Sequence, residues 1–238
     1  MLKYKLLSLF LHVSGLFAFI CIALILIIPS FVFLPFFYGS VKACCRFMLF
    51  SLLLWPKIKG QFPSEGTYII MMNHSSFVDV FIFPLIPKGA WTGITAAENF
   101  KIPLFSTIIN RIQAIPIDRK NRNTAIQSIK RAEEVLKQGI HIGILPEGTR
   151  TVDGKMSEFK KGGFHMAINT NTAIIPVGVL GAYNFKPKDR WWMMPGPISI
   201  NIGTPTNVSE YSDLGVSGLK NKVELAIKEL SGECYEVK

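Results

Sequence analysis

A histidine and an aspartate five residues apart, His74 and Asp79, are the pair in this sequence best suited to acid–base chemistry. They lie in the polar segment Asn73–Asp79, which follows an apolar run. Residues five apart point about 140° apart around a helix, so the two side chains cannot share one helical face. If His74 lies in a loop and Asp79 in a first helical turn, the carboxylate can bind one imidazole nitrogen. The other nitrogen can then remove a proton from a hydroxyl group.

The same segment has a second interpretation. Asparagine and serine before an apolar helix are typical N-terminal caps, so Asn73–Ser76 could cap a helix over the apolar run Val80–Ile86. His74 would then have a structural role. The residues of this segment alone leave both interpretations open.

A second polar segment, Pro146–Arg150, follows the apolar run Ile140–Leu145, which predicts a buried strand. Open α/β sheets bind ligands at the carboxyl ends of their strands. Gly148 lets the backbone approach an anion, Thr149 offers a hydroxyl group, and Arg150 offers a guanidinium fork that matches phosphate. An ordinary turn is the alternative, but the presence of both motifs in one chain favours a functional site.

In this order, behind a long apolar N-terminus, the two motifs resemble those of the glycerolipid acyltransferases, the lysophosphatidate acyltransferase family. Three further segments extend the resemblance across most of residues 57–205, namely Ile117–Arg119, Phe159–Gly162 and Ile174–Gly178. The first looks like the family block in which an arginine contributes to the acceptor site. The last looks like an apolar strand with a proline near the catalytic cleft.

The resemblance implies an α/β fold with a mixed sheet flanked by helices. It implies transfer of a fatty acyl group from acyl-CoA or acyl-acyl carrier protein to the free hydroxyl of 1-acylglycerol-3-phosphate, giving phosphatidate. His74 would be the general base and Asp79 its orienting carboxylate. The implied substrate-binding residues are Glu147, Gly148, Thr149, Arg150 and Arg119. Because a thioester is already activated, no metal, cofactor or acyl-enzyme is implied.

The sequence is compatible with other functions. Related enzymes commonly carry a lysine where this chain has Ala96 or Ala97, although Lys101 is nearby. The acceptor could therefore be another lysophospholipid or an amino-acid lipid, and a non-catalytic lipid-binding protein is a further alternative. Ser75 and Ser76 adjoin His74, but neither lies in a Gly-x-Ser-x-Gly elbow, which disfavours a hydrolase.

The N-terminus predicts a membrane anchor, because Leu6–Val41 contains no Asp, Glu, Lys or Arg. One straight helix of this length would measure about 54 Å, more than the hydrocarbon core of about 30 Å. Pro29 and Pro35 predict a division into two helical legs, the first over Leu6–Ile28 and the second reaching Trp55. A cleaved signal peptide is disfavoured, because the apolar run is long and no small-residue cleavage site follows it.

Basic residues flank this anchor and characterise the whole chain. Lys42 and Arg46 lie four apart on the second leg, where they can reach lipid phosphates, and Lys57 and Lys59 follow. These residues favour a membrane location with the catalytic domain on the cytoplasmic face. The net charge of +10 fits anionic membrane lipids better than nucleic acid, because no nucleic-acid motif accompanies the scattered basic groups. The four cysteines and four histidines show no metal-ligand spacing.

The remaining pattern predicts two parts, a membrane-anchoring helical segment over residues 1–56 and an α/β domain over 57–238. Apolar runs predict six strands, at Tyr68–Met72, Trp91–Thr95, Ala114–Ile117, Ile140–Leu145, Ala173–Val179 and Ile198–Ile202. Helical periodicity is clearest over Thr124–Gln138, with Asn123 as the expected N-cap and Gly139 as the stop. A last amphipathic helix begins near Ser217.

Overall fold

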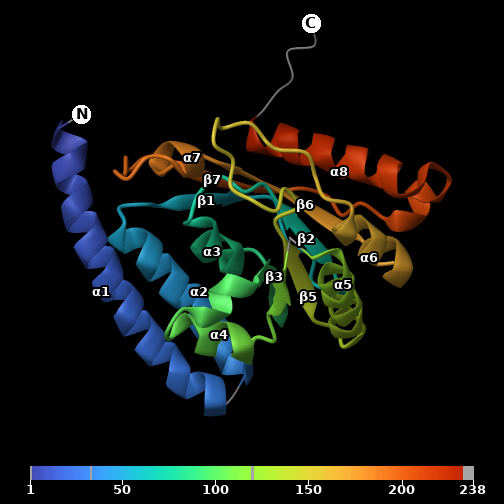
Figure 1. The fold of residues 1–238 in the computed structure, drawn as a ribbon, viewed down its shortest axis with the longest axis horizontal. Helices are drawn as coiled ribbons and strands as arrows, with labels where there is room; N and C mark the ends of the chain where they lie inside the picture. Colours follow the sequence, from blue (N-terminus) through green and yellow to red (C-terminus); the bar gives the residue numbers. More distant parts are fainter. Residues whose placement is uncertain (1, 33, 119–120, 233–238) are drawn as a thin grey trace, which may run out of the picture.

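A seven-stranded sheet forms the centre of the computed structural model, which describes residues 2–32, 34–118 and 121–232 (Figure 1). The strands are β1 (Pro56–Lys59), β2 (Ile69–Met72), β3 (Trp91–Ala96), β4 (Ile115–Ile117), β5 (His141–Ile144), β6 (Ile174–Leu180) and β7 (Ile198–Ile202). Their spatial order is β1-β7-β6-β2-β5-β3-β4. Neighbours run parallel except β6 and β7, which run antiparallel. The expected mixed sheet flanked by helices is confirmed.

The central strands carry apolar side chains on both faces, as parallel strands covered by helices do. In β2, Ile70 and Met72 pack into one hydrophobic cluster, whereas Ile69 and Met71 pack into the other. The period of two along a strand explains this division. All six strands expected from apolar runs are present, and each boundary lies within one residue of the expected one. The exposed edge strand β1 was not predicted from the sequence. It starts at Pro56 and contains two lysines, so it lacks the apolar run that indicated the other strands.

Helices cover both faces of the sheet (Figure 1). The first face carries α1 (Leu2–Val32), α2 (Leu34–Ser51), α3 (Asp79–Ile82) and α4 (Phe105–Arg111), and the second carries α5 (Arg122–Lys137), α6 (Gly162–Thr170) and α8 (Gly215–Ser231). A short α7 (Ala182–Phe185) follows β6. Single 3₁₀ segments are η1 (Phe83–Leu85), η2 (Ala97–Lys101) and η3 (Val208–Leu214). The loop that carries His74 leads into α3 on the first face.

Helix α5 begins two residues earlier than its apolar periodicity predicts. The expected N-cap Asn123 is wrong, because the Asn121 side chain accepts hydrogen bonds from the N–H groups of Asn123 (3.0 Å) and Thr124 (3.4 Å). The backbone of Asn121 is extended, as an N-cap requires. At the other end Gly139 has φ of +80°, which confirms the expected stop.

The two N-terminal helices confirm a two-legged arrangement but correct its boundary. Helix α1 continues past Pro29 to Val32, and α2 begins at Leu34, so the expected division at Pro29 is wrong. Pro35 falls in the first turn of α2, where a missing backbone N–H is tolerated. Among the described residues, one helical segment, Leu2–Leu26, is long and apolar enough to cross a membrane, with a mean hydropathy of 2.6.

Helices α1 and α2 also pack against the α/β part of the chain. One hydrophobic cluster runs from Leu11 of α1 and Leu49 of α2 to Ile82 of α3 and Ile175 of β6. The oxygen of the Ser8 hydroxyl accepts from the backbone N–H of Met193 at 2.7 Å, in the segment after α7. The first helical segment is therefore built into the same core as the sheet.

Candidate active site

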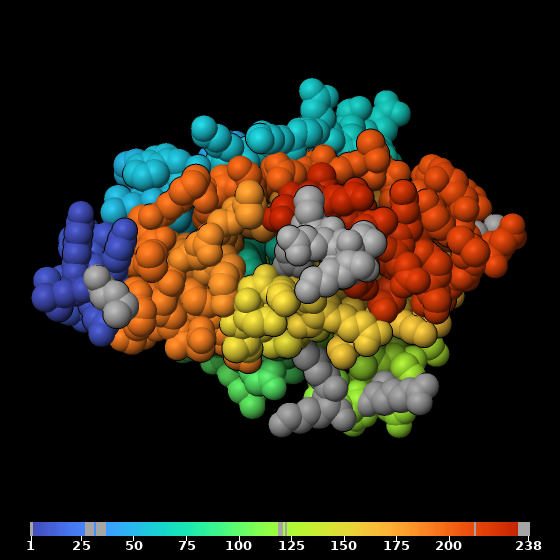
Figure 2. Space-filling model, turned by 90° about the horizontal axis from the view of Figure 1, so that it is seen from above, coloured from blue at the N-terminus to red at the C-terminus, as the bar shows by residue number. Residues whose placement is uncertain are grey.

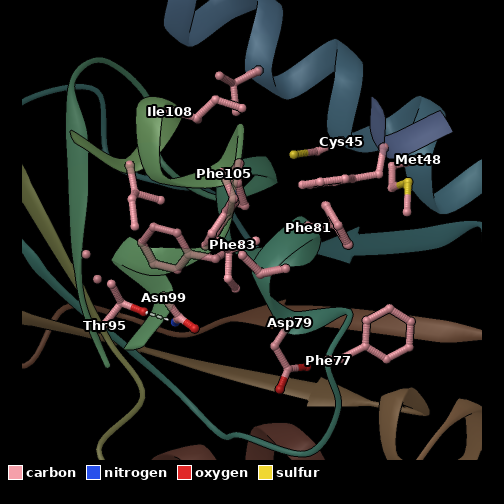
Figure 3. Close-up of a pocket in the computed structure, with 18 of the residues that line it drawn as sticks. Cys45, Met48, Phe77, Asp79, Phe81, Phe83, Thr95, Asn99, Phe105 and Ile108 are labelled. Carbon is pink, nitrogen blue, oxygen red and sulfur yellow. Dashed lines mark hydrogen bonds between the residues drawn. The ribbon is translucent and has the colours of Figure 1, made fainter. Parts of the chain in front are cut away.

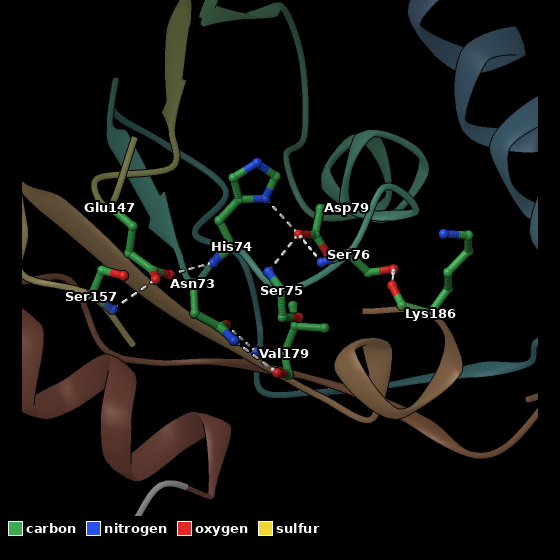
Figure 4. Close-up of polar contacts among 9 residues, drawn as sticks. All are labelled: Asn73, His74, Ser75, Ser76, Asp79, Glu147, Ser157, Val179 and Lys186. Carbon is green, nitrogen blue, oxygen red and sulfur yellow. Dashed lines mark hydrogen bonds and ion pairs between the residues drawn. The ribbon is translucent and has the colours of Figure 1, made fainter. Parts of the chain in front are cut away.

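His74 and Asp79 form a hydrogen-bonded pair at the carboxyl end of β2 (Figure 4). His74 lies in the loop after the strand, and Asp79 is the first residue of α3. The distance from His74 Nδ1 to Asp79 Oδ2 is 2.7 Å. The Asp79 side chain is fully buried, whereas 18% of the His74 side chain is exposed. This placement is the one that the five-residue spacing predicts for an acid–base pair.

The surroundings of Asp79 determine which imidazole nitrogen carries the proton. Oδ2 of Asp79 also accepts from the backbone N–H groups of Ser75 at 2.9 Å and Ser76 at 3.0 Å. Three donors around one oxygen stabilise the ionised carboxylate. Nδ1 of His74 is therefore the protonated nitrogen, and Nε2 has a free lone pair that can accept a proton.

Glu147 fixes the loop that carries His74. Its Oε1 accepts from the backbone N–H of His74 at 2.6 Å, and its Oε2 accepts from that of Ser157 at 2.9 Å (Figure 4). The backbone N–H of Thr151 donates to the carbonyl oxygen of His74 at 3.0 Å. The two motifs that lie far apart in sequence are thus joined through backbone atoms of His74. Glu147, which the resemblance assigns to substrate binding, makes these contacts in a buried position.

Asn73 connects the same loop to β6. Its side-chain amide donates to the carbonyl oxygen of Val179 at 3.0 Å, and its side-chain oxygen accepts from the N–H of Val179 at 2.7 Å. The side chain thus extends the pairing of β2 and β6 beyond the last strand residue. A helix cap was one of the two interpretations of this segment, but the N-cap of α3 is Val78, and no side chain caps the helix. The contact between Asn73 and Val179 had no local signal in the sequence. The contact between Ser157 and Glu147 had no local signal in the sequence either.

Neither serine next to His74 is arranged as a nucleophile. The Ser76 hydroxyl donates to the carbonyl oxygen of Lys186 at 2.9 Å. The Ser75 hydroxyl is buried and makes no hydrogen bond within the described part of the chain. A serine nucleophile requires a hydrogen bond to its base, so these positions support direct proton removal from a substrate by His74.

Gly148, Thr149 and Arg150 form the turn after β5. Gly148 has φ of +75°, a conformation that favours glycine, and its N–H donates to the carbonyl oxygen of Leu145 at 3.0 Å. Thr149 and Arg150 line the same cavity as His74 and Asp79. Arg119, the remaining expected site residue, lies outside the described residues.

The cavity has a volume of about 950 Å³ and is largely apolar (Figure 3). Its walls come from α1, α2, η1, β3, α4 and β5 and include Leu26, Cys45, Met48, Phe83, Phe105 and Ile108. In Figure 3, Cys45 and Met48 lie far from Asp79, and Phe81 and Phe83 lie between them. Cavities of this size hold one sizeable organic ligand. The site therefore joins an acid–base pair to a long apolar chamber.

The polar end of the cavity comprises His74, Asp79, Thr149, Arg150, Lys186 and Lys188. Thr149 and Lys188 are exposed, so this end opens to the surface. Seen from above, the yellow segment after β5 and the orange segment after β6 border a recess in which earlier, teal residues are visible (Figure 2). No local pattern in the sequence marks these two lysines as site residues, because their place in the cavity depends on the path of the chain after α7.

Comparisons with known proteins agree on one family. A family model described as Acyltransferase matches residues 57–180. A 1-acyl-sn-glycerol-3-phosphate acyltransferase of Cocos nucifera is 35% identical over 74% of this chain and 57% of its own length. Proteins with the same name from Limnanthes douglasii and Pseudomonas aeruginosa are each 27% identical, over 82% and 71% of this chain and 74% and 65% of their own lengths. The chain therefore spans between about half and three quarters of these relatives.

A solved structure shares the whole fold. The crystal structure of the 1-acyl-sn-glycerophosphate (LPA) acyltransferase PlsC from Thermotoga maritima superposes with a TM-score of 0.86. The match covers 97% of each chain at 24% sequence identity. This likeness extends through the N-terminal helices and supports the fold as described.

Proposed function

Because this chain belongs to the acyltransferase family, we propose that it transfers a fatty acyl group from a thioester to the free hydroxyl of 1-acylglycerol-3-phosphate. The product is phosphatidate, and the donor is acyl-CoA or acyl-acyl carrier protein. The observation that carries this proposal is the His74–Asp79 pair at the polar end of an apolar cavity. The names of the relatives support the choice of acceptor.

In the proposed reaction, Nε2 of His74 removes the proton from the acceptor hydroxyl as its oxygen attacks the thioester carbonyl carbon. A tetrahedral intermediate forms, and its collapse breaks the carbon–sulfur bond. The leaving thiolate takes the proton from the His74 imidazolium, so acyl ester and free thiol are produced and His74 returns to neutrality. Asp79 keeps the imidazole in the required tautomer and stabilises the imidazolium.

We assign Glu147 to positioning rather than to direct contact with substrate. Its two oxygens accept backbone N–H groups of His74 and Ser157, which supports a role in fixing the base. Gly148, Thr149 and Arg150 keep their proposed role in anion binding, because Thr149 and Arg150 line the cavity. Arg119 remains proposed for the acceptor site from the resemblance.

The apolar cavity is proposed to receive an acyl chain. Burial of each methylene group contributes about 0.8 kcal/mol, so a long chain that fills the cavity gains substantial binding energy. The membrane supplies such chains, and α1 is apolar enough to lie in it. We propose that residues 1–56 anchor the protein and that the catalytic part faces the cytoplasm, which the basic residues Lys57 and Lys59 support.

The direct test is an acyl-transfer assay with purified protein in lipid vesicles. Acyl-CoA and acyl-acyl carrier protein are each supplied with a panel of acceptors, namely lysophosphatidate, lysophosphatidylcholine, an acylated amino acid and monoacylglycerol. Mass spectrometry of the lipid products identifies which acceptor is acylated. Formation of phosphatidate by wild type and its loss in His74→Ala is expected. A wild type that acylates no member of the panel would rule out catalysis of this class.

A different lysolipid acceptor is the second candidate, and Ala96 favours it. This small apolar residue of β3 lines the cavity near Thr95 and Asn99, whose side chains bond each other at 2.6 Å. Ala96→Lys adds a positive charge there. If the acceptor carries a phosphomonoester, the variant should retain or increase kcat/KM for lysophosphatidate. If the acceptor is zwitterionic or an amino-acid lipid, wild type should prefer it, and the added charge should weaken its use.

A further inference from the structure

Three cationic side chains from two separate segments line the polar end of the cavity. Arg150 comes from the turn after β5, and Lys186 and Lys188 come from the segment after α7. Asp79 is the one carboxylate among the described residues that line this cavity. Its Oδ2 is occupied by His74 and two backbone N–H groups. The polar end therefore has an excess of positive charge.

The positive charges interact with one another. The pKa of Lys186 lies below its ordinary value, first because the side chain is partly buried and then because Arg150 and Arg190 are close, while Asp189 acts in the opposite direction. Like charges held together in a partly dry site destabilise one another, and a bound anion relieves that repulsion. The arrangement is the one expected of an anion-binding site in its free state.

The segment that carries the two lysines is held in a defined position. The Ser76 hydroxyl, two residues after His74, donates to the carbonyl oxygen of Lys186 at 2.9 Å (Figure 4). Lys186 Nζ donates to the carbonyl oxygen of Arg190 at 2.6 Å. The Arg190 guanidinium in turn donates to the carbonyl oxygens of Asn184, of Phe185 at 2.9 Å and of Trp192 at 3.1 Å. Lys186 is thus fixed relative to the loop of the general base, and Lys188 belongs to the same bonded segment.

We propose that Lys186 and Lys188, together with Arg150, bind the phosphate group of the acceptor whose hydroxyl His74 deprotonates. This inference rests on the proposed acyl transfer and adds two residues that lie outside both sequence motifs. In 1-acylglycerol-3-phosphate the reacting hydroxyl and the phosphate are on adjacent carbon atoms, so the phosphate must lie next to His74. The phosphates of coenzyme A lie at the far end of the pantetheine arm, away from the thioester.

The test compares KM values for lysophosphatidate and for acyl-CoA in Lys188→Ala and Lys186→Met. Lys188 is exposed, so its replacement leaves the fold intact. Each variant should raise KM for lysophosphatidate about 10-fold, the effect of losing one charge-assisted hydrogen bond. KM for acyl-CoA should not change. Lys222→Ala, on the exposed side of α8, is the matched control and should behave as wild type.

A soluble probe separates binding from turnover. Glycerol 3-phosphate should compete with lysophosphatidate, and its inhibition constant should rise about 10-fold in Lys188→Ala. Because Lys186 also bonds the Arg190 carbonyl oxygen, Lys186→Arg serves as the charge-retaining variant and should restore most of the acceptor affinity that Lys186→Met loses.

Several results would overturn the inference. An unchanged KM for lysophosphatidate in both Lys188→Ala and Lys186→Met would exclude the lysines from the site. A raised KM for acyl-CoA with an unchanged acceptor KM would assign them to the donor phosphates instead. Wild type could acylate only phosphate-free acceptors and lose that activity in His74→Ala. The proposed binding of an acceptor phosphate would then be wrong, while the acyltransferase function would stand. Absence of any acyl transfer would instead reject the function itself.

Discussion

Two histidines of this chain differ in the partners of their ring nitrogens. His141, at the start of β5, accepts at Nδ1 from the backbone N–H of Tyr68 (3.1 Å) and donates from Nε2 to the carbonyl oxygen of Lys88 (3.0 Å). Both of its nitrogens are used by backbone atoms, so it is structural. His74 uses one nitrogen for a buried carboxylate, and the residue lines the cavity. This difference supports a catalytic role for His74 and a structural role for His141.

Replacement of His74 by alanine should reduce acyl transfer by about 10²- to 10⁴-fold, the usual contribution of a positioned general base. Asp79→Asn should be nearly as severe, because the imidazole loses the carboxylate that stabilises its charged form. Initial rates in vesicles measure the effect. Circular dichroism of each variant checks that the fold is retained. A His74→Ala protein that keeps more than about a tenth of wild-type turnover would show that another group is the base.

Proton binding at His141 should make stability depend on pH. Burial lowers the pKa of His141 below its ordinary value of 6.5, because desolvation disfavours the charged ring. The unfolded chain therefore binds more protons than the folded protein below about pH 6.5, and the free energy of unfolding falls as pH falls through that range. Urea unfolding at pH 7.5 and pH 5.5 measures the change. His141→Gln should have a lower free energy of unfolding than wild type at pH 7.5, but that free energy should fall less between pH 7.5 and pH 5.5. An equal fall in the variant and in wild type would show that His141 does not cause the pH dependence.

At the scale of elements, α1 carries two apolar faces with different environments. Leu11, Ile22 and Leu26 are buried and line the cavity, whereas Phe10 and Phe17 are 65% and 70% exposed. A helix that is apolar all round is typical of a segment in contact with lipid. Deletion of α1 would remove both the proposed anchor and a wall of the cavity. Only changes on the exposed face of α1 test membrane binding separately from the cavity.

Phe10→Ser combined with Phe17→Ser should weaken membrane binding without altering the cavity. Burial of each phenyl group contributes about 1.5 kcal/mol or more, so the pair should lower partition into vesicles on the order of 100-fold. Vesicle flotation measures the bound fraction, and Leu225→Ser on exposed α8 is the control. Full retention on vesicles would mean that another surface supplies the anchor.

At the scale of the whole molecule, the cavity forms between elements from the first and the middle parts of the chain. Cys45 of α2 and Ile108 of α4 line it far from Asp79, while β3 and β5 line it near the polar end (Figure 3). Phe83 packs against Gly143 of β5, where a Cβ atom would lie 2.2 Å from the ring, so a glycine is required for this close approach. The depth available to an acyl chain is therefore a property of the assembled fold.

Cys45→Trp should shorten the preferred acyl donor, because the indole occupies space at the end of the cavity far from Asp79. We expect kcat/KM for long-chain acyl-CoA to fall while that for short-chain acyl-CoA is retained. A donor series of increasing chain length measures the shift. Phe47→Trp, at an exposed position of the same helix, is the control. An unchanged preference in Cys45→Trp would place the acyl chain elsewhere.

Local sequence was sufficient for much of this protein. The apolar runs predicted six of the strands, and the two motifs and their order identified the acid–base pair and the family. The spacing of His74 and Asp79 predicted a loop-to-helix placement because helical geometry forbids the alternative on one face. These features are encoded within a few residues of one another, so periodicity and spacing reveal them.

Only the tertiary structure decided which distant residues complete the site. The Glu147 side chain accepts from the backbone N–H of His74, and the Asn73 side chain bonds the backbone of Val179. The Ser76 hydroxyl donates to the carbonyl oxygen of Lys186. These contacts join residues about 70 to 110 positions apart, and they depend on β2 lying between β5 and β6 in the sheet. Strand order is a property of the packed core rather than of any one segment, so no local pattern in the sequence predicts the contacts that depend on it.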